Sequence, residues 1–362
     1  EYRNHRWERI EEGHSLRQKI SSEIVNYFKD LYTSESKEII NDNNTKEDMK
    51  LIQHKLSTIA KIICNLKTSP YKTNIMKESM EVFYDNQFIS ELDSNRMLIG
   101  FKNGVYDLDK HIFRDGLPDD YISTQMGINY NKELTENHKS VIDVFDFLEK
   151  VFPDKSVRNY FLDTSSDVFI GGNHNKLVLF WSGEGDNGKS VTQNIFEKMF
   201  GEYAVKLPTS LITGKRTQSS MACPELPRAG NGVRWAVLQE PDQKDVLNIG
   251  LLKQLSGNDS FYVRPLYQEG REIDPMFKLV LICNEPPKVP FSDKAAWNRI
   301  RVIPFESTFC DNVPDSFEEQ LEEKRFPVDR HFNDKIPKLV EAFAWVLLQH
   351  KKTTITSCEE PD

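Results

Sequence analysis

The stretch Gly183-Glu184-Gly185-Asp186-Asn187-Gly188-Lys189-Ser190 directly follows an apolar run, Leu177–Trp181. This glycine loop (residues 183–190) fits the P-loop pattern G-x-x-x-x-G-K-[ST]. Its glycines let successive backbone N–H groups point at phosphate oxygens, Lys189 can reach the β/γ-phosphates, and the Ser190 hydroxyl can ligate Mg²⁺. Apolar residues then recur at helical spacing, which places the start of a helix at the bound anion. The loop therefore predicts binding of a nucleotide with Mg²⁺ by residues 183–190.

The composition limits the kind of protein and its compartment. The chain has 362 residues, a net charge of −9, and no apolar run that approaches the length of a bilayer span. Its five cysteines are dispersed and odd in number, which favours a reducing compartment. We expect a cytoplasmic protein that is neither secreted nor inserted in a membrane. The acidic balance argues against a nucleic-acid coat but permits a basic channel.

The apolar spacing predicts three regions. Residues 1–135 should form a mostly helical domain with a small β element over 96–114, and polar residues 33–46 should form an exposed loop. Residues 136–310 should form an α/β ATPase domain, and residues 311–362 a helical C-terminal segment. The chain begins at Glu1-Tyr2 without a Met, which we interpret as a fragment of a longer polypeptide.

The expected fold class is α/β, with a parallel central sheet covered by helices on both faces. Continuous apolar runs mark its strands, and helical spacing marks the segments between them. The predicted strands cover 177–181, 233–238, 278–283 and 300–305; the predicted helices cover 137–152, 155–170, 189–200, 246–256 and 332–350; a hairpin is expected over 260–275.

Polar residues at two predicted strand ends are candidates for the chemistry. Glu240 and Asp242 follow the strand 233–238, where Glu240 could orient a water or contact the metal and Asp242 could assist. Asn284 follows the strand 278–283 and could bond the γ-phosphate or the attacking water. The alternatives are that the carboxylates cap a loop and that Asn284 starts a turn before two prolines.

Two arginines flank Ile300 at the mouth of the last strand. An arginine here can stabilise transition-state charge in a neighbouring subunit. The alternative for Arg299 and Arg301 alike is a surface arginine that bonds local carbonyls.

As an ordered set, these motifs resemble superfamily 3 helicases, an AAA+-related group. The closer resemblance is to the poxvirus-type nucleoside triphosphatase of large DNA viruses, whose full chains join a primase to this helicase. The stretches that carry it are Gly183–Ser190, Leu238–Glu240, Leu255–Asp259, Val263–Tyr267, Phe277–Pro287 and Trp297–Phe305, with Phe101–Leu108 and Asp120–Ile122 upstream.

The resemblance implies a replicative ATP-dependent DNA helicase that assembles as a homo-oligomer, usually a hexameric ring, and moves 3′→5′ on single-stranded DNA. It also implies a location in the host cytoplasm or at a viral replication site. Lys189, Ser190, Glu240 and Asn284 would act within one subunit, while Arg299 would reach in from the neighbour, with Arg301 in reserve. The hairpin matches the DNA-engaging hairpin of the family, and its candidate DNA-binding residues are Lys253, Arg264, Tyr267 and Arg271.

The chain departs from the family pattern at two positions. Gln239 stands where many P-loop ATPases have an Asp, which leaves open whether Glu240 or Asp242 contacts the metal. Asn298 stands where a first arginine is common, which favours Arg299 as the finger. Two other functions stay open: a P-loop phosphotransferase acting on a small molecule, and a ring scaffold that nucleotide locks without turnover.

Overall fold

The computed structural model describes residues 1–39, 45–213, 225–230, 232–241, 246–264, 270–289, 294–353 and residue 360. The chain divides into two compact units: a helical unit of Glu1 with Glu8–Ile89, and a sheet unit of Tyr2–Trp7 with Ser90–Asp362. The functional boundaries expected at 135/136 and 310/311 stay predictions.

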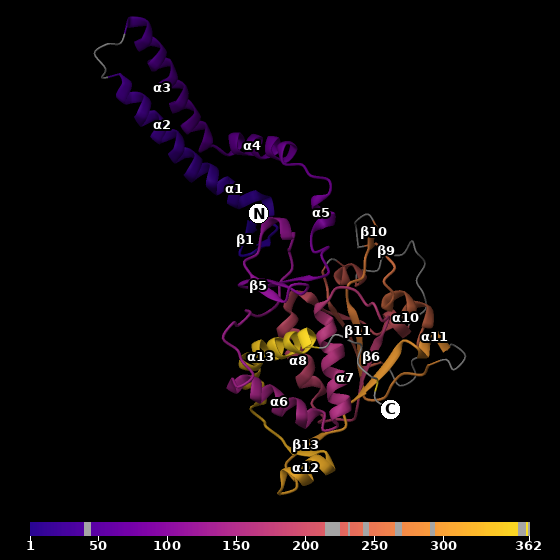
Figure 1. Cartoon of the computed structure of the whole chain (residues 1–362). Helices are drawn as coiled ribbons and strands as arrows, with labels where there is room; N and C mark the ends of the chain where they lie inside the picture. The colour runs from indigo at the N-terminus through magenta and orange to yellow at the C-terminus, as the bar shows by residue number, and fades with distance from the viewer. Residues whose placement is uncertain are drawn as a thin grey trace. The chain divides into compact units, whose positions relative to one another are not determined.

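The helical unit is dominated by two long helices, α2 (Val25–Glu38) and α3 (Lys46–Leu66), which lie side by side (Figure 1). The predicted loop over 33–46 is wrong at both ends: α2 continues through Glu38, and α3 already begins at Lys46. Contacts between the helices explain the extension, since Glu35 on α2 pairs with Lys55 on α3 at 3.5 Å. The other helices are α1 (His14–Lys19), a π-helical turn (Ile20–Ile24), α4 (Ser69–Val82) and α5 (Phe88–Glu91).

A reciprocal cap starts α3. The Thr45 hydroxyl accepts from the Asp48 amide at 3.2 Å, and the Asp48 carboxylate accepts from the Thr45 amide at 2.9 Å. This capping box satisfies two amides at the first turn.

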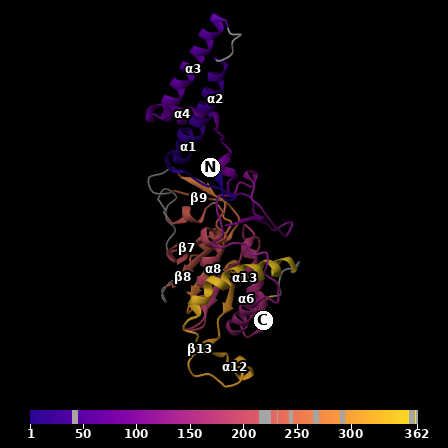
Figure 2. The ribbon, with the colours of Figure 1, turned by 90° about the vertical axis from the view of Figure 1, so that its left-hand side faces the viewer.

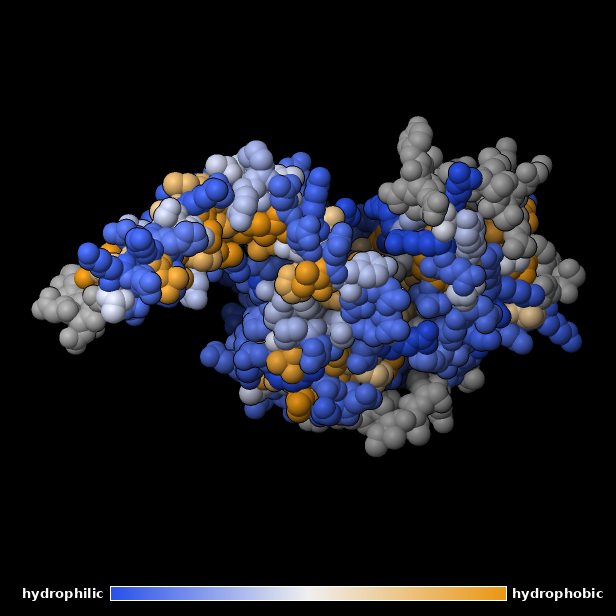
Figure 3. Space-filling model, turned by 90° about the horizontal axis from the view of Figure 1, so that it is seen from above, coloured by the Kyte–Doolittle hydropathy of each residue, from blue (hydrophilic) through white to orange (hydrophobic). Residues whose placement is uncertain are grey.

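The helical unit exposes apolar side chains among hydrophilic ones (Figure 3). The exposed apolar residues of this unit include Met80 and Phe83.

The sheet unit is built on five parallel strands, which confirms the α/β class with a parallel central sheet. Their spatial order is β12 (Ile300–Pro304), β6 (Val178–Ser182), β11 (Lys278–Cys283), β8 (Trp235–Gln239) and β7 (Ala204–Leu207). Strand β7 was not predicted; Figure 2 shows β7 and β8 beside α8 (Lys189–Phe200).

Helices cover both faces of this sheet, as expected from the apolar strands. Along β6, Leu179 and Trp181 enter one core cluster while Val178 and Phe180 enter another, because successive strand side chains point to opposite faces. The first face is covered by α6 (Lys139–Val151), α7 (Lys155–Ser166), α8 and α13 (Phe332–Thr353), and the second by α9 (Ser210–Thr213) and α10 (Ile249–Ser256) (Figure 1).

The small β element is present as predicted. Its antiparallel strands are β3 (Leu98–Phe101), β4 (Gly104–Asp107) and β5 (Ile112–Arg114). Phe101 and Tyr106 belong to the same core cluster as the sheet residues Leu179 and Trp181. The element therefore packs as part of the sheet unit.

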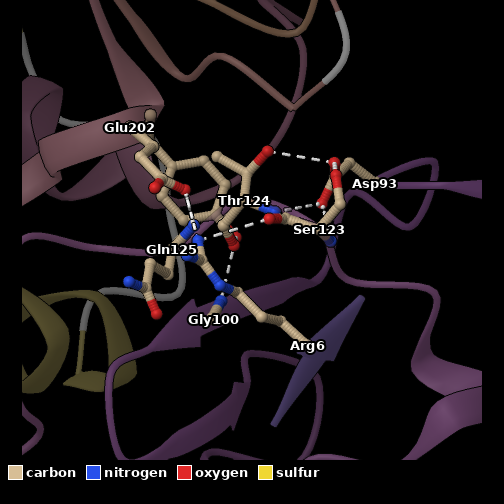
Figure 4. Close-up of polar contacts among 8 residues, drawn as sticks. Arg6, Asp93, Gly100, Ser123, Thr124, Gln125 and Glu202 are labelled. Carbon is tan, nitrogen blue, oxygen red and sulfur yellow. Dashed lines mark hydrogen bonds and ion pairs between the residues drawn. The ribbon is translucent and has the colours of Figure 1, made fainter. Parts of the chain in front are cut away.

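Polar contacts fix this element to the turn that follows α8 (Figure 4). Asp93 accepts from the amides of Ser123 and Thr124 at 2.8 and 3.1 Å. The buried Tyr203 hydroxyl donates to the Thr124 carbonyl at 2.8 Å and accepts from the Gly100 amide at 2.9 Å. Glu202 accepts from Arg6 and from the Gln125 amide. The C-terminal end of α8 is thus held by several segments.

The remaining strands and α-helices of the sheet unit lie outside the five-stranded sheet. They are β1 (Tyr2–Arg3), β2 (Arg6–Trp7), the hairpin β9 (Phe261–Val263) and β10 (Arg271–Ile273), α11 (Lys294–Trp297), β13 (Thr308–Cys310), α12 (Phe317–Glu323) and β14 (Arg325–Pro327). Among the described residues, no helix combines the length and apolarity that a bilayer crossing requires.

We predict that Gly127→Ala lowers thermal stability. A Cβ at Gly127 would lie 2.1 Å from the Lys198 carbonyl oxygen, a backbone atom at the end of α8. Overpacking of this kind costs about 1–3 kcal/mol. Gly250→Ala is the matched control, because the exposed Gly250 lies in α10 with no neighbour closer than 3.4 Å. Thermal unfolding followed by circular dichroism should rank Gly127→Ala below both wild type and Gly250→Ala; equal midpoints would contradict the close contact.

Candidate nucleotide-binding site

The glycine loop lies between β6 and α8, at the carboxyl edge of the parallel sheet. Gly188 has φ +84°, a backbone conformation that favours glycine. A Cβ at Gly183 would lie 2.4 Å from the Phe305 carbonyl oxygen, whereas one at Gly185 would meet nothing within 4 Å. The conformation of the loop therefore requires glycine at positions 183 and 188, whereas position 185 has room for a side chain.

Asn187 holds the loop against the end of β12. Its side chain is buried, and its Nδ2 donates to the carbonyls of Glu184 and Phe305, the latter at 3.2 Å. Its Oδ1 accepts from the Lys189 amide at 3.3 Å. Asn187, predicted as a nucleotide contact of the loop, thus also determines the loop's conformation.

The Lys189 ammonium lies within the loop. Its Nζ donates to the Gly183 carbonyl, to the Glu184 carbonyl at 3.2 Å and to Asn187 Oδ1 at 3.2 Å. Burial lowers the pKa of Lys189, and the neighbouring Cys283 opposes this shift. Burial in turn raises the pKa of the Cys283 thiol to about 11, so the group beside Lys189 is a neutral thiol at pH 7. A phosphate would give this buried ammonium a charged partner.

The two strand-end candidates lie at the same edge as the loop. The Ser182 hydroxyl, directly before the loop, donates to the Asn284 backbone carbonyl at 3.1 Å. The Glu240 amide donates to the Ile282 carbonyl at 3.0 Å. Because β11 lies between β6 and β8, Asn284 is one strand from the loop and Glu240 two strands.

Glu240 has an unusual backbone conformation. Its φ is +50°, which is uncommon for a residue other than glycine, and its side chain is exposed at the strand end. Such conformations concentrate at functional sites. Asp242, the other candidate after this strand, lies outside the described residues.

Gln239 connects β8 to the helix that follows the loop. Its Nε2 donates to Gln193 Oε1 at 2.6 Å, and Gln193 donates to Glu197 at 2.5 Å. Glu197 also pairs with Lys206 of β7 at 2.8 Å. The Gln239 amide therefore ties the sheet to α8.

Both arginines lie at the opposite edge of the sheet from the loop. Ile300 pairs with Val178, the first residue of β6, whereas the loop follows the last residue, Ser182. Arg299 Nη1 donates to Ser256 Oγ at 2.9 Å and to the Lys253 carbonyl at 3.0 Å. Arg301 donates to local carbonyls, at 2.9 Å to that of Ile300. The structure thus does not bring the arginines to the loop of their own chain.

The predicted hairpin is present, with Arg271 opposite Val263. Arg264 and Arg271 are exposed on it, Lys253 lies on α10, and Tyr267 lies outside the described residues. Sequence reasoning missed Tyr262, which is half exposed and lies over Gly270, where a Cβ would meet its hydroxyl at 1.9 Å. The alternation of side-chain direction along Phe261–Arg264 could have predicted the exposure of Tyr262, since residues 262 and 264 point away from the buried face.

Fold and site together define an α/β protein with a strand, a glycine loop and a helix at the carboxyl edge of a parallel sheet. Residues 1–153 match the family model described as "D5 N terminal like". "Putative helicase 184R" of Invertebrate iridescent virus 6 is 43% identical over 312 residues, which cover 84% of this chain and 32% of that protein. "Putative helicase L207/L206" of Acanthamoeba polyphaga mimivirus is 34% identical over 356 residues, 97% of this chain and 36% of that protein.

A more distant relative is named as a primase. "Putative primase C962R" of African swine fever virus is 25% identical over 260 residues, 71% of this chain and 27% of that protein. The chain spans about a third of the length of the curated viral helicases it matches. These matches confirm the resemblance to the D5-type primase-helicases of large DNA viruses.

A solved structure, "The A form apo structure of NrS-1 C terminal region-CTR", aligns at 16% identity and a TM-score of 0.41. The alignment covers 59% of this chain and 46% of that one.

We predict that Lys189→Ala abolishes ATP binding and turnover, because the loop loses the cation placed for the phosphates. Binding is measured by titration calorimetry with Mg-ATP, and turnover by phosphate release. Lys198→Ala is the matched control, since the exposed Lys198 lies on the same helix. Undiminished ATP affinity in Lys189→Ala would contradict the prediction that the loop binds ATP.

Proposed function

We propose that this chain is the motor part of an ATP-dependent DNA helicase that hydrolyses ATP at the interfaces between identical subunits. The observation that carries the proposal is the separation of the candidate residues between two edges of one sheet. Lys189, Asn284 and Glu240 are at the carboxyl edge, and Arg299 precedes β12 at the other edge. The names of the viral relatives favour this motor over the phosphotransferase and the nucleotide-locked scaffold.

Within one subunit, the loop residues 183–190 would hold the triphosphate, and Asn284 and Glu240 would orient the attacking water. Ser190 and Glu240 are exposed and offer oxygen ligands, which suit Mg²⁺. When bound, Mg²⁺ would neutralise charge on the β- and γ-phosphates. Within the described part of the chain, no cluster of three or more His, Cys, Asp or Glu could hold a metal by itself, which agrees with a metal that is bound largely through phosphate oxygens.

Arg299 would act on the nucleotide of a neighbouring subunit. Between Val178 and Gly183 the chain advances five residues, which at ~3.3 Å per residue is about 16 Å. An arginine side chain does not span that distance, so Arg299 is excluded from the loop of its own chain. A closed ring joins two different surfaces of neighbouring subunits. We propose that one of them carries Arg299 and the other the glycine loop, and that the ring is a hexamer, as the family resemblance implies.

The hairpin would engage single-stranded DNA inside the ring. Exposed Arg264 and Arg271 supply charge for phosphates, and the half-exposed Tyr262 supplies a ring for base stacking. A primase in the same full-length polypeptide would be the natural partner, as the resemblance implies.

The direct test of the proposed function is ATP-driven unwinding of a forked duplex by the oligomer, together with stimulation of its ATPase activity by single-stranded DNA. ATP turnover that is indifferent to DNA and to protein concentration would instead support the phosphotransferase.

We predict that Arg299→Ala keeps ATP binding but loses most hydrolysis, because arginine fingers contribute roughly 10³–10⁵-fold to the rate. Mixing this variant with Lys189→Ala subunits should restore part of the turnover, since a mixed interface combines an intact loop with an intact arginine. Arg301→Ala is the comparison variant and should retain more activity. The phosphate-release rate is measured across mixing ratios, and absence of rescue at every ratio would exclude action between subunits.

We predict that replacing Arg264 and Arg271 by Ala weakens single-strand binding while basal ATPase activity is kept. Each DNA phosphate that the protein no longer neutralises should flatten the plot of log affinity against log salt by about 0.7. Fluorescence anisotropy with a labelled oligonucleotide measures both quantities. Arg330→Ala is the matched control, because Arg330 is an exposed arginine that pairs with Asp311 and lies outside the hairpin. An unchanged affinity and slope would remove the hairpin from DNA binding.

A further inference from the structure

A cavity of about 280 Å³ adjoins the glycine loop at Asp186 and Gly188. It is lined by residues of the loop and of α8, by α6, and by the segment from β13 to the start of α13. Those used below are Asp186, Gly188, Val191, Phe309, Val328 and Phe332. We call this cavity the nucleoside pocket.

Phe309 makes the pocket continuous with the loop. Its amide donates to the Asp186 carbonyl at 2.8 Å, and a Cβ at Gly188 would lie 3.4 Å from its ring. Val191, in the first turn of α8, lines the same cavity two residues after Lys189. The cavity therefore borders directly on the loop that would hold the phosphates of a nucleotide.

Part of the pocket wall is aromatic and aliphatic. The rings of Phe147 on α6 and Phe332 on α13 stack with centroids 5.1 Å apart and planes 27° from parallel. Val328, which is 38% exposed, lines the pocket beside them. Aromatic and aliphatic walls of this kind bind a planar aromatic group through stacking and burial.

Four of the five charged side chains that line the cavity form two ion pairs, and the fifth belongs to Asp186 of the glycine loop. Lys150 pairs with Asp146 at 2.7 Å, and Lys335 pairs with Asp329 at 2.5 Å. The hydrogen bond with Lys335 lowers the pKa of Asp329, and the same bond raises that of Lys335. The lysines offset carboxylates that would otherwise repel an anionic ligand, and the ion pairs offer polar partners for sugar hydroxyls.

We propose that the nucleoside pocket binds the base and ribose of the nucleotide whose triphosphate lies on the glycine loop. The inference rests on the proposed function, since it needs phosphates at residues 183–190. The cavity is near the lower end of ligand-pocket volumes, which suits one nucleoside. This proposal gives the segment from β13 to the start of α13, which carries no sequence motif, a role in nucleotide binding.

The test compares two ligands, Mg-ATP and Mg-tripolyphosphate, by titration calorimetry on the whole chain. The variant Val328→Trp fills the pocket from an exposed position. We expect it to weaken ATP binding about tenfold or more, while tripolyphosphate affinity stays at the wild-type value. Val82→Trp is the matched control, because Val82 is an exposed valine on α4. Val328→Glu, which places a carboxylate against the base, should act in the same direction if the tryptophan variant unfolds early.

The outcomes separate the pocket from the loop. Equal ATP affinity in wild type, Val328→Trp and Val328→Glu would overturn the nucleoside pocket and leave triphosphate binding by the loop intact. Wild-type binding of ATP no tighter than that of tripolyphosphate would do the same. Failure of wild type to bind either ligand would instead overturn the proposed function, and the pocket proposal with it.

Discussion

The contact between the glycine loop and the end of β12 is the constraint on which the site depends. Gly183 has no room for a side chain against the Phe305 carbonyl, and Asn187 donates to that same oxygen. The loop therefore has its shape only if β12 ends at this point. Five residues earlier β12 begins beside Arg299, and four residues later the chain reaches Phe309 in the nucleoside pocket. A short segment, residues 299–309, thus joins the loop, the pocket and the residue proposed for the neighbouring subunit.

The fold could be predicted best where local sequence and tertiary packing agree. The helix Lys189–Phe200 and the strand Lys278–Cys283 have the bounds expected from their apolar pattern, because the loop glycines start the one and burial on both faces selects the other. Strand β7 was missed since its four residues are too few to establish a period. The extension of α2 through polar residues to Glu38 depends on contacts with α3 that the local composition does not encode.

The site could be predicted as a set of residues but not as an arrangement. Strand ends identified Glu240 and Asn284, because carboxyl ends of parallel strands meet at one edge. Which of them lies nearer the loop depends on the spatial strand order, which places β11 between β6 and β8 and which the sequence order of the strands does not determine. Phe309 and Phe332 carried no motif, since apolar residues that line a ligand pocket have the same pattern as residues that fill a core.

Under the proposed function, Arg299 has two competing sets of acceptors. Within its own subunit, Nη1 donates to the Lys253 carbonyl and to Ser256 Oγ, at the C-terminal end of α10. A guanidinium that turned to a neighbour's phosphates would give up these bonds, because the planar group points in one direction at a time. The end of α10 leads through Gly257–Ser260 into β9 of the hairpin. Engagement of a neighbouring nucleotide would then release a contact at the base of the hairpin, so one side chain would link the ATP-bearing interface to the element proposed to hold DNA.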